Sequence, residues 1–326
     1  MLQTVKRIGG ALLLGALLAV ANLPPAQAQA QSQAQQSAND AALMEQLKGK
    51  LTGRVSIPDE KSATLVQPQG REWREVLEGP VKSAGGWLLV AVIVVLAAFF
   101  AWRGRVRVEG GFSGRTVERF NALDRFTHWL TAVSFVILGL SGLNMTFGRR
   151  LILPLIGPES FHSLTTIGKW SHDYVSFAFV FGVFLMAVLW IRHNFFRAFD
   201  VEWLREGGGL LKKGVHPPAG KFNAGQKIIF WLVILGALVQ AVSGYMLMFP
   251  FYVADMAGMQ LSLLVHAVAG LLFVALILAH IYIGTLGMEG AFDAMGTGQV
   301  DVNWAKEHHS LWAPEAPGAR ATGDDD

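Results

Sequence analysis

The sequence predicts an all-α membrane protein, built as a four-helix transmembrane bundle with one extra transmembrane helix before it. Of the 326 residues, 52% are apolar, and the mean hydropathy is +0.39, which is higher than in ordinary soluble domains. Five apolar stretches are long enough to cross a bilayer. They lie at about 84–102, 124–146, 172–192, 227–248 and 260–284. Only helices and closed barrels can cross lipid, and apolar blocks of about 20 residues indicate helices.

The N-terminal residues 1–28 have the pattern of a signal peptide. Two basic residues precede an apolar run, and Ala26-Gln27-Ala28 offers a cleavage site with small residues. An uncleaved anchor helix is the alternative. The segment 29–83 is then expected to be periplasmic and partly disordered, because its first part is low-complexity sequence rich in Gln, Ala and Ser.

Cleavage of the signal peptide would place residue 29 outside and run the extra helix, 84–102, inward. The basic loop 103–123 and the tail 285–326 are then cytoplasmic, as is the basic connection between the third and fourth spans. This agrees with the preference of cytoplasmic loops for Lys and Arg. The pattern predicts a multi-pass protein of the bacterial inner (cytoplasmic) membrane.

Two histidines, His266 and His280, stand fourteen residues apart in the last span. Fourteen residues are close to four helical turns, so both side chains project from nearly the same face, about 21 Å apart along the axis. Because an ionisable residue inside a membrane helix is costly, it indicates function. His128 begins the second span on the inner side, and His172 begins the third on the outer side.

These four histidines form two pairs matched in depth, His172 with His266 and His128 with His280. Two neutral imidazoles are suitable axial ligands for a b haem in electron transfer. We therefore expect two haem b groups within 124–284, a four-helix di-haem cytochrome b domain. A single membrane histidine can instead be a packing residue. His162, expected in a loop, and His193 are interfacial competitors, His216 is expected to be solvated, and His308 with His309 is a weak metal-binding candidate.

Composition excludes several other classes of chemistry. The chain has no cysteine, so it holds no iron–sulfur cluster, thiolate zinc site or c-type haem. Its formal charge of +3 gives no support to nucleic-acid binding.

The residues 115–312 resemble the cytochrome b (gamma) subunit of respiratory formate dehydrogenase. The similarity rests on RFTHW (125–129), KFNAGQK (221–227), LLVHAVAG (263–270), ILAHIYIG (277–284) and WAKEHHSLW (304–312). The signal peptide, the exported segment and the extra span lie outside the compact form of that family.

The resemblance implies a role in anaerobic respiration with an iron–sulfur beta subunit and a molybdenum or tungsten alpha subunit as partners. Electrons from formate would pass through two b haems to quinone (menaquinone or ubiquinone) on the cytoplasmic side. It maps the outer haem ligands onto His172 and His266, and the inner ones onto His128 and His280. It maps the quinone site onto Asn223, Gly225 and Gln226. The chain would hold no formate-oxidising site, and no catalytic residue is expected in it.

Three alternatives remain open. Asn223 and Gln226 could simply cap the fourth span. The chain could be the cytochrome b subunit of a membrane-bound hydrogenase or of a thiosulfate or polysulfide reductase. It could also be a haem-free membrane anchor, in which the histidines are incidental.

Overall fold

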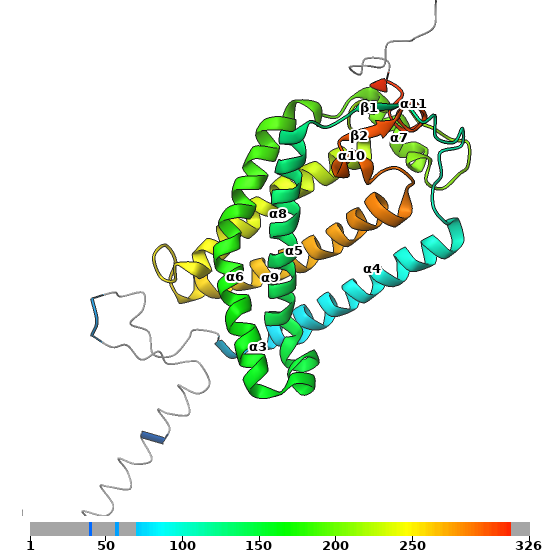
Figure 1. Ribbon diagram of the computed structural model, residues 1–326. Coiled ribbons are helices and arrows are strands. Elements are labelled where there is room, and N and C mark those ends of the chain that lie inside the picture. The colour runs from blue at the N-terminus through cyan, green and yellow to red at the C-terminus, as the bar shows by residue number, and fades with distance from the viewer. Residues whose placement is uncertain (1–38, 41–55, 59–69, 314–326) are drawn as a thin grey trace, which may run out of the picture. The chain divides into compact units, whose positions relative to one another are not determined.

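The computed structural model describes residues 39–40, 56–58 and 70–313. In it, each of the five apolar stretches lies in a long helix (Figure 1). Within these residues, five helices are long and apolar enough to cross a membrane, which confirms the predicted fold class. They are α4 (Lys82–Arg103), α5 (Ala122–Leu151), α6 (Leu153–Trp190), α8 (Ala224–Met248) and α9 (Met256–Tyr282). The predicted signal peptide and most of 29–83 lie outside the described residues.

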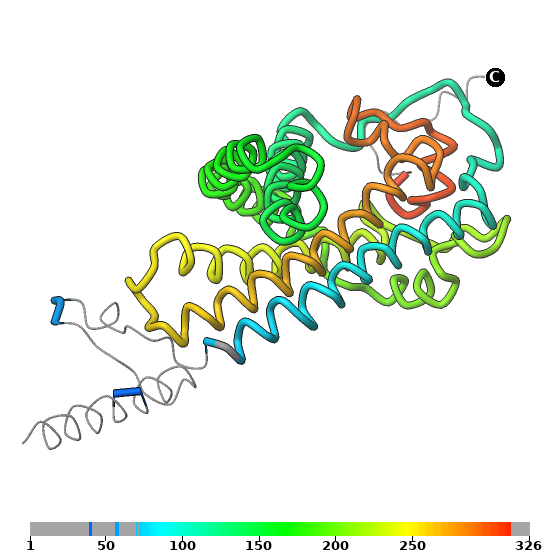
Figure 2. The backbone as a smooth tube through the Cα atoms, turned by 90° about the horizontal axis from the view of Figure 1, so that it is seen from below, coloured from blue at the N-terminus to red at the C-terminus, as the bar shows by residue number. Residues whose placement is uncertain are grey.

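The helices pack as two antiparallel hairpins. Helix α5 packs along α6, and α8 packs along α9, while α4 lies along the outer side of α9. Figure 2 shows that the α5–α6 hairpin crosses the other three helices instead of running parallel to them. Helices α5 and α9 therefore meet only over a short length, and side chains from both can enclose a space between them.

Helix α5 turns a polar stripe toward the protein interior. Thr127, Thr131 and Ser141 are buried, and the hydroxyls of Thr131 and Ser141 bond to backbone carbonyls one turn earlier. Such bonds satisfy a buried hydroxyl inside a helix. On α6, a Cβ at Gly182 would lie 2.5 Å from the Thr131 hydroxyl, so glycine allows the two helices to approach closely here.

Helix α6 corrects the prediction for the third span. The sequence predicted a span that begins at about residue 172, with His162 in the loop before it. In the structure Gly157 forms a kink at φ 77°, and Pro158 starts the continuing helix, so His162 is helical and not in a loop. The element has 38 residues, about 57 Å at helical rise, and exceeds a hydrocarbon core of about 30 Å.

A small folded unit, here called the end cap, joins residues 104–121 to residues 288–313. Strand β1 (Thr116–Glu118) pairs antiparallel with β2 (Gln299–Asp301), and α10 (Asp293–Gly296) and α11 (Val302–His308) follow the last span. Trp304 and Val300 are almost fully buried in it. The segments expected as a basic loop and a tail are thus packed against each other.

Helix α4 is largely exposed, as a lipid-facing helix would be. Of its residues only Gly85 is buried, where a Cβ would lie 2.3 Å from the Leu271 side chain of α9. Its C-terminal part also reaches a cavity near α9, because Leu96 and Phe99 are among the lining residues. The extra helix is therefore less peripheral than the sequence indicated.

Deleting residues 29–102, with a new start near Gly104, should leave two b haems per chain. Helix α4 contains no histidine and contacts the bundle mainly through α9. The measurement is the haem-to-protein ratio and the reduced-minus-oxidised spectrum of the purified complex. Loss of either haem band would show that α4 belongs to the redox core.

Candidate functional site: two histidine pairs and an adjoining pocket

The structure brings the four singled-out histidines together as two pairs. The ring centroids of His172 and His266 lie 6.0 Å apart, and those of His128 and His280 lie 6.2 Å apart. One member of each pair comes from the α5–α6 hairpin and the other from α9. The crossing of the two hairpins therefore places paired imidazoles at two levels of the bundle.

Both imidazoles of the first pair have a defined tautomer. Ser141 Oγ lies 2.9 Å from His172 Nδ1, and Ser243 Oγ lies 3.1 Å from His266 Nδ1. Each serine hydroxyl already donates its hydrogen to a backbone carbonyl, at 2.7 Å for Ser141 and 2.6 Å for Ser243. The serine oxygen must then accept from Nδ1–H, which leaves the lone pair of each ring on Nε2.

The spacing of both pairs fits a shared iron. Metal–nitrogen bonds of about 2 Å on each side place two imidazole centroids about 6 Å apart. Glycines also bring neighbouring helices close to the rings of the first pair. A Cβ at Gly244 would lie 3.0 Å from His266 Cε1, and one at Gly142 would lie 3.5 Å from His172 Cε1. The residues present therefore fit a bis-histidine haem at each level.

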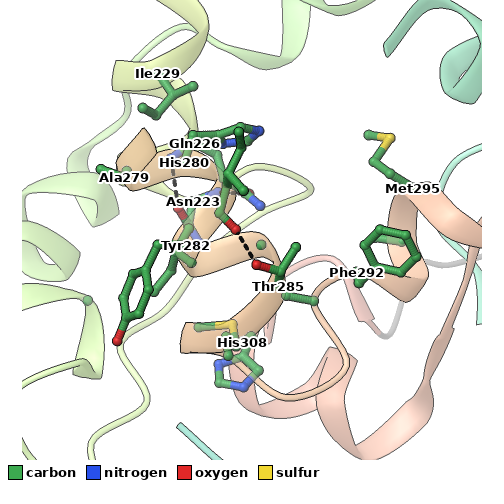
Figure 3. Close-up of a pocket in the computed structure, with 18 of the residues that line it drawn as sticks. Asn223, Gln226, Ile229, Ala279, His280, Tyr282, Thr285, Phe292, Met295 and His308 are labelled. Atoms are coloured by element: carbon green, nitrogen blue, oxygen red, sulfur yellow. Dashed lines mark hydrogen bonds between the residues drawn. The ribbon is translucent and has the colours of Figure 1, made fainter. Parts of the chain in front are cut away.

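The second pair opens into a large, mainly apolar cavity of about 1030 Å³. His128 and His280 line it, together with bundle residues such as Phe135, Phe179 and Phe273. Figure 3 shows the part of the cavity around His280, with Asn223 and Gln226 on the same pocket. His128 Nδ1 is buried and has no hydrogen-bond partner in the part of the chain that the structure describes.

Asn223 and Gln226 form a capping box at the start of α8. Asn223 Oδ1 accepts from the Gln226 amide at 2.9 Å, and Gln226 Oε1 accepts from the Asn223 amide at 3.0 Å. The capping alternative is therefore correct for the oxygen atoms. These bonds use only the two side-chain oxygens, so the two NH₂ groups remain as donors beside the cavity.

Gly225 lines the same cavity, and its small size is needed for packing. A Cβ there would lie 2.8 Å from the ring of Trp203 in α7 (Ala198–Arg205). Trp203 could not be identified from the sequence, because no neighbouring residue indicates that it contacts a residue of another helix.

Arg119 is a second residue that sequence reasoning missed. It is buried, and its guanidinium donates to Lys221 O at 2.8 Å and to Gln226 Oε1 at 3.3 Å. Burial lowers its pKa to about 9, so it remains charged at pH 7. Among the described residues no carboxylate forms an ion pair with it. The cavity therefore has a positive group next to the Asn223 and Gln226 amides.

The tail histidines do not form the metal pair that was weighed for them. His309 is fully buried, and its Nδ1 lies 2.7 Å from Gly220 O. His308 lines the cavity with a buried Nε2 that has no partner within residues 70–313. His216 lies exposed in a loop, as expected, and its Nε2 lies 3.3 Å from Glu109 Oε2.

Acid should loosen the end cap. Burial holds the pKa of His309 well below its ordinary value of 6.5, so the folded state binds fewer protons than the unfolded state. Stability is then complete above about pH 6.5 and falls as the pH drops, by up to about 1.4 kcal/mol per pH unit. The protection factors for hydrogen exchange of residues 299–313, corrected for the intrinsic rate at each pH, should fall between pH 7 and pH 5, while α4 serves as the internal reference. Equal protection at both pH values would contradict this.

Comparison with known proteins gives one family match. The family model described as prokaryotic cytochrome b561 matches residues 119–298, which is more than half of the chain. The match covers α5, α6, α8 and α9 in full, and all four paired histidines lie inside it.

Curated relatives point the same way. The chain is 30% identical over 211 residues to the cytochrome b556(Fdn) subunit of the nitrate-inducible formate dehydrogenase of Escherichia coli K12. That alignment covers 64% of this chain and 94% of the relative. It is 26% identical over 203 residues to the cytochrome b556(fdo) subunit of formate dehydrogenase from the same strain, covering 61% and 93%. The cytochrome b556 subunit of formate dehydrogenase from Haemophilus influenzae is 25% identical over 204 residues, covering 61% and 83%.

Proposed function

The chain belongs to the prokaryotic cytochrome b561 family, and on that basis we propose that it is the membrane cytochrome b subunit of a formate dehydrogenase, which passes electrons to quinone. The proposal rests on the two histidine pairs, whose ring centroids lie 6.0 and 6.2 Å apart. The cavity beside the His128–His280 pair, which has polar side chains at its edge, supports it as well.

His172 and His266 would hold one b haem, and His128 and His280 would hold the other. When bound, such bis-histidine haems supply one-electron transfer between the two levels of the bundle. Ser141 and Ser243 orient the first pair by fixing which ring nitrogen carries the proton. Phe135 and Phe273 pack between the levels, with ring centroids 5.0 Å apart, and keep the interior apolar and dry.

The cavity beside His280 is the proposed quinone site. A quinone has two carbonyl oxygens that need donors, and the free NH₂ groups of Asn223 and Gln226 can supply them. Arg119 adds a fixed positive charge that stabilises these oxygens as they become electron-rich during reduction. The capping bonds hold both amides in place, so the structural and functional roles are compatible.

Sidedness follows in this proposal from the distribution of basic residues. Arg103, Arg105 and Arg107 follow α4, and the connection from α6 to α8 is also basic, which favours the cytoplasm for the end cap. The His172–His266 level would then be periplasmic and the quinone site cytoplasmic. Inward electron transfer with cytoplasmic proton uptake separates charge without a proton channel.

The proposed partners are a periplasmic catalytic subunit with molybdenum or tungsten and an iron–sulfur subunit that relays electrons. Without a cysteine, this chain cannot hold an iron–sulfur cluster itself. We assign bond breaking in formate to the catalytic partner subunit.

The test is purification of the tagged chain from membranes with its native partners. We expect co-purifying formate dehydrogenase subunits, b-type absorption, and formate-dependent reduction of a short-chain naphthoquinone or benzoquinone. Reduction by hydrogen or thiosulfate instead of formate would keep the cytochrome and change the partner. Absence of b-type absorption would overturn the proposal.

A further inference from the structure

Three titratable side chains form a line from the surface of the end cap to the cavity. Glu109 is exposed, and its Oε2 lies 3.3 Å from His216 Nε2. The rings of His216 and His308 have centroids 6.1 Å apart, a gap that one bridging water can span. All three residues line the same cavity as Asn223, Gln226 and His280. Figure 3 shows His308 on this pocket together with Asn223, Gln226 and His280.

We propose that His308 delivers protons to a quinone bound in this cavity and receives them from the surface through Glu109 and His216. The inference rests on the proposed function and adds a proton donor to it. Formate oxidation to CO₂ on a partner subunit releases two electrons and one proton there. Quinone takes up two electrons and two protons from the cytoplasmic side, and two O–H bonds form to give quinol.

The atoms of His308 suit this task. The His308 side chain lines the cavity, and its Nε2 is buried with no hydrogen-bond partner among residues 70–313. A buried donor without a partner costs about 1–3 kcal/mol, which is tolerated where a ligand completes the site. An imidazole has a second ring nitrogen, and the His216 ring is the neighbouring titratable group with which His308 can exchange a proton through a bridging water.

Burial keeps His308 neutral at rest. Burial lowers its pKa to about 4; Glu307 raises it, while His216 and Arg119 lower it. The His308 ring also packs against Trp304, with the ring centroids 5.2 Å apart. A neutral imidazole has one donor and one acceptor, so it can release a proton from one nitrogen and accept one at the other.

Glu109 is a suitable entrance. It accepts from the Gly214 amide at 2.6 Å, and this bond, followed by that to His216, lowers its pKa. It is therefore ionised at neutral pH and can collect protons from solvent. Glu307 is less suitable, because its two oxygens accept from the amides of Glu109 and Gly110.

The test compares His308→Gln with wild type in the purified complex with its partner subunits. General acid catalysis contributes about 10²–10⁴-fold, so kcat for quinone reduction should fall at least tenfold with KM for quinone little changed. Formate oxidation with an artificial dye and the haem content should stay as in wild type. In His308→Ala, which leaves space for the small molecule, added imidazole should restore part of kcat. His162→Gln, on α6, is the matched control.

Glu109→Gln should reduce kcat less, because solvent still reaches the 30% exposed side chain of His216. A kcat for His308→Gln within twofold of wild type would overturn the relay. So would a loss that imidazole does not restore in His308→Ala and that accompanies faster hydrogen exchange of the end cap, since that indicates a structural role. If wild type itself oxidises formate but reduces no quinone, the proposed function fails and the relay with it.

Discussion

Replacing His266 by alanine should lower the haem content from two b haems per chain to one. The substitution removes one axial ligand, and the remaining imidazole of His172 cannot hold and orient the porphyrin alone. His280→Ala should remove the other haem and leave the first at least partly assembled. Both effects are measured as the haem-to-protein ratio and as the change in each b-type absorption band of the reduced complex.

The control is His162→Ala, which removes a histidine of α6 that belongs to neither pair. It should retain two haems. The pairing would be wrong if wild type contained a single haem, or if neither His266→Ala nor His280→Ala changed the haem content. Loss of both haems after either substitution would mean that the pairs do not assemble separately.

Asn223→Ala and Gln226→Ala should impair quinone reduction while formate oxidation by an artificial dye continues. A hydrogen bond lost from a buried quinone carbonyl costs about 1–3 kcal/mol, or about five- to a hundredfold in affinity. The measurement is KM for a short-chain quinone beside the dye-linked rate. Equal loss of both activities would show that these residues serve assembly only.

Capping and quinone contact can be separated with a more conservative variant. Asn223→Asp keeps the oxygen that accepts from the Gln226 amide but loses the NH₂ donor. It should therefore retain the helix cap and still raise KM. Asn121 caps α5 with the same geometry, accepting from the Asp124 amide at 2.9 Å, and it does not line the cavity. Asn121→Asp introduces the same charge at an equivalent cap and should leave KM unchanged.

The bundle could be predicted because a transmembrane helix appears in a sequence as a long apolar stretch. Apolar blocks gave the number of spans, and the fourteen-residue spacing of His266 and His280 placed two imidazoles on one face. Depth alone matched His172 with His266 and His128 with His280, and the structure brings the same residues together. Their role as haem ligands stays a prediction.

The end cap could not be predicted, because its contacts are short and distant in sequence. Strands β1 and β2 have three residues each and join Thr116 to Asp301. No periodic pattern marks such a pairing. The same holds for Arg119 and His308, whose positions depend on which surfaces meet after the last span. The apolar stretch 172–192 does not show where its helix begins, and in the structure α6 starts at Leu153 and continues past a kink at Gly157.

The long-range pairing of the end cap also sets the order in which the protein can be completed. Val106 pairs with Met288, so the segment that follows α4 cannot form this pairing until α9 and the residues after it have been synthesised. The transmembrane helices can insert one after another, since their backbone bonds are local. Arg119 and Trp304, by contrast, meet only after nearly the whole chain has left the ribosome. We therefore expect the histidine-bearing bundle to form early in biogenesis and the pocket beside His280 to close last.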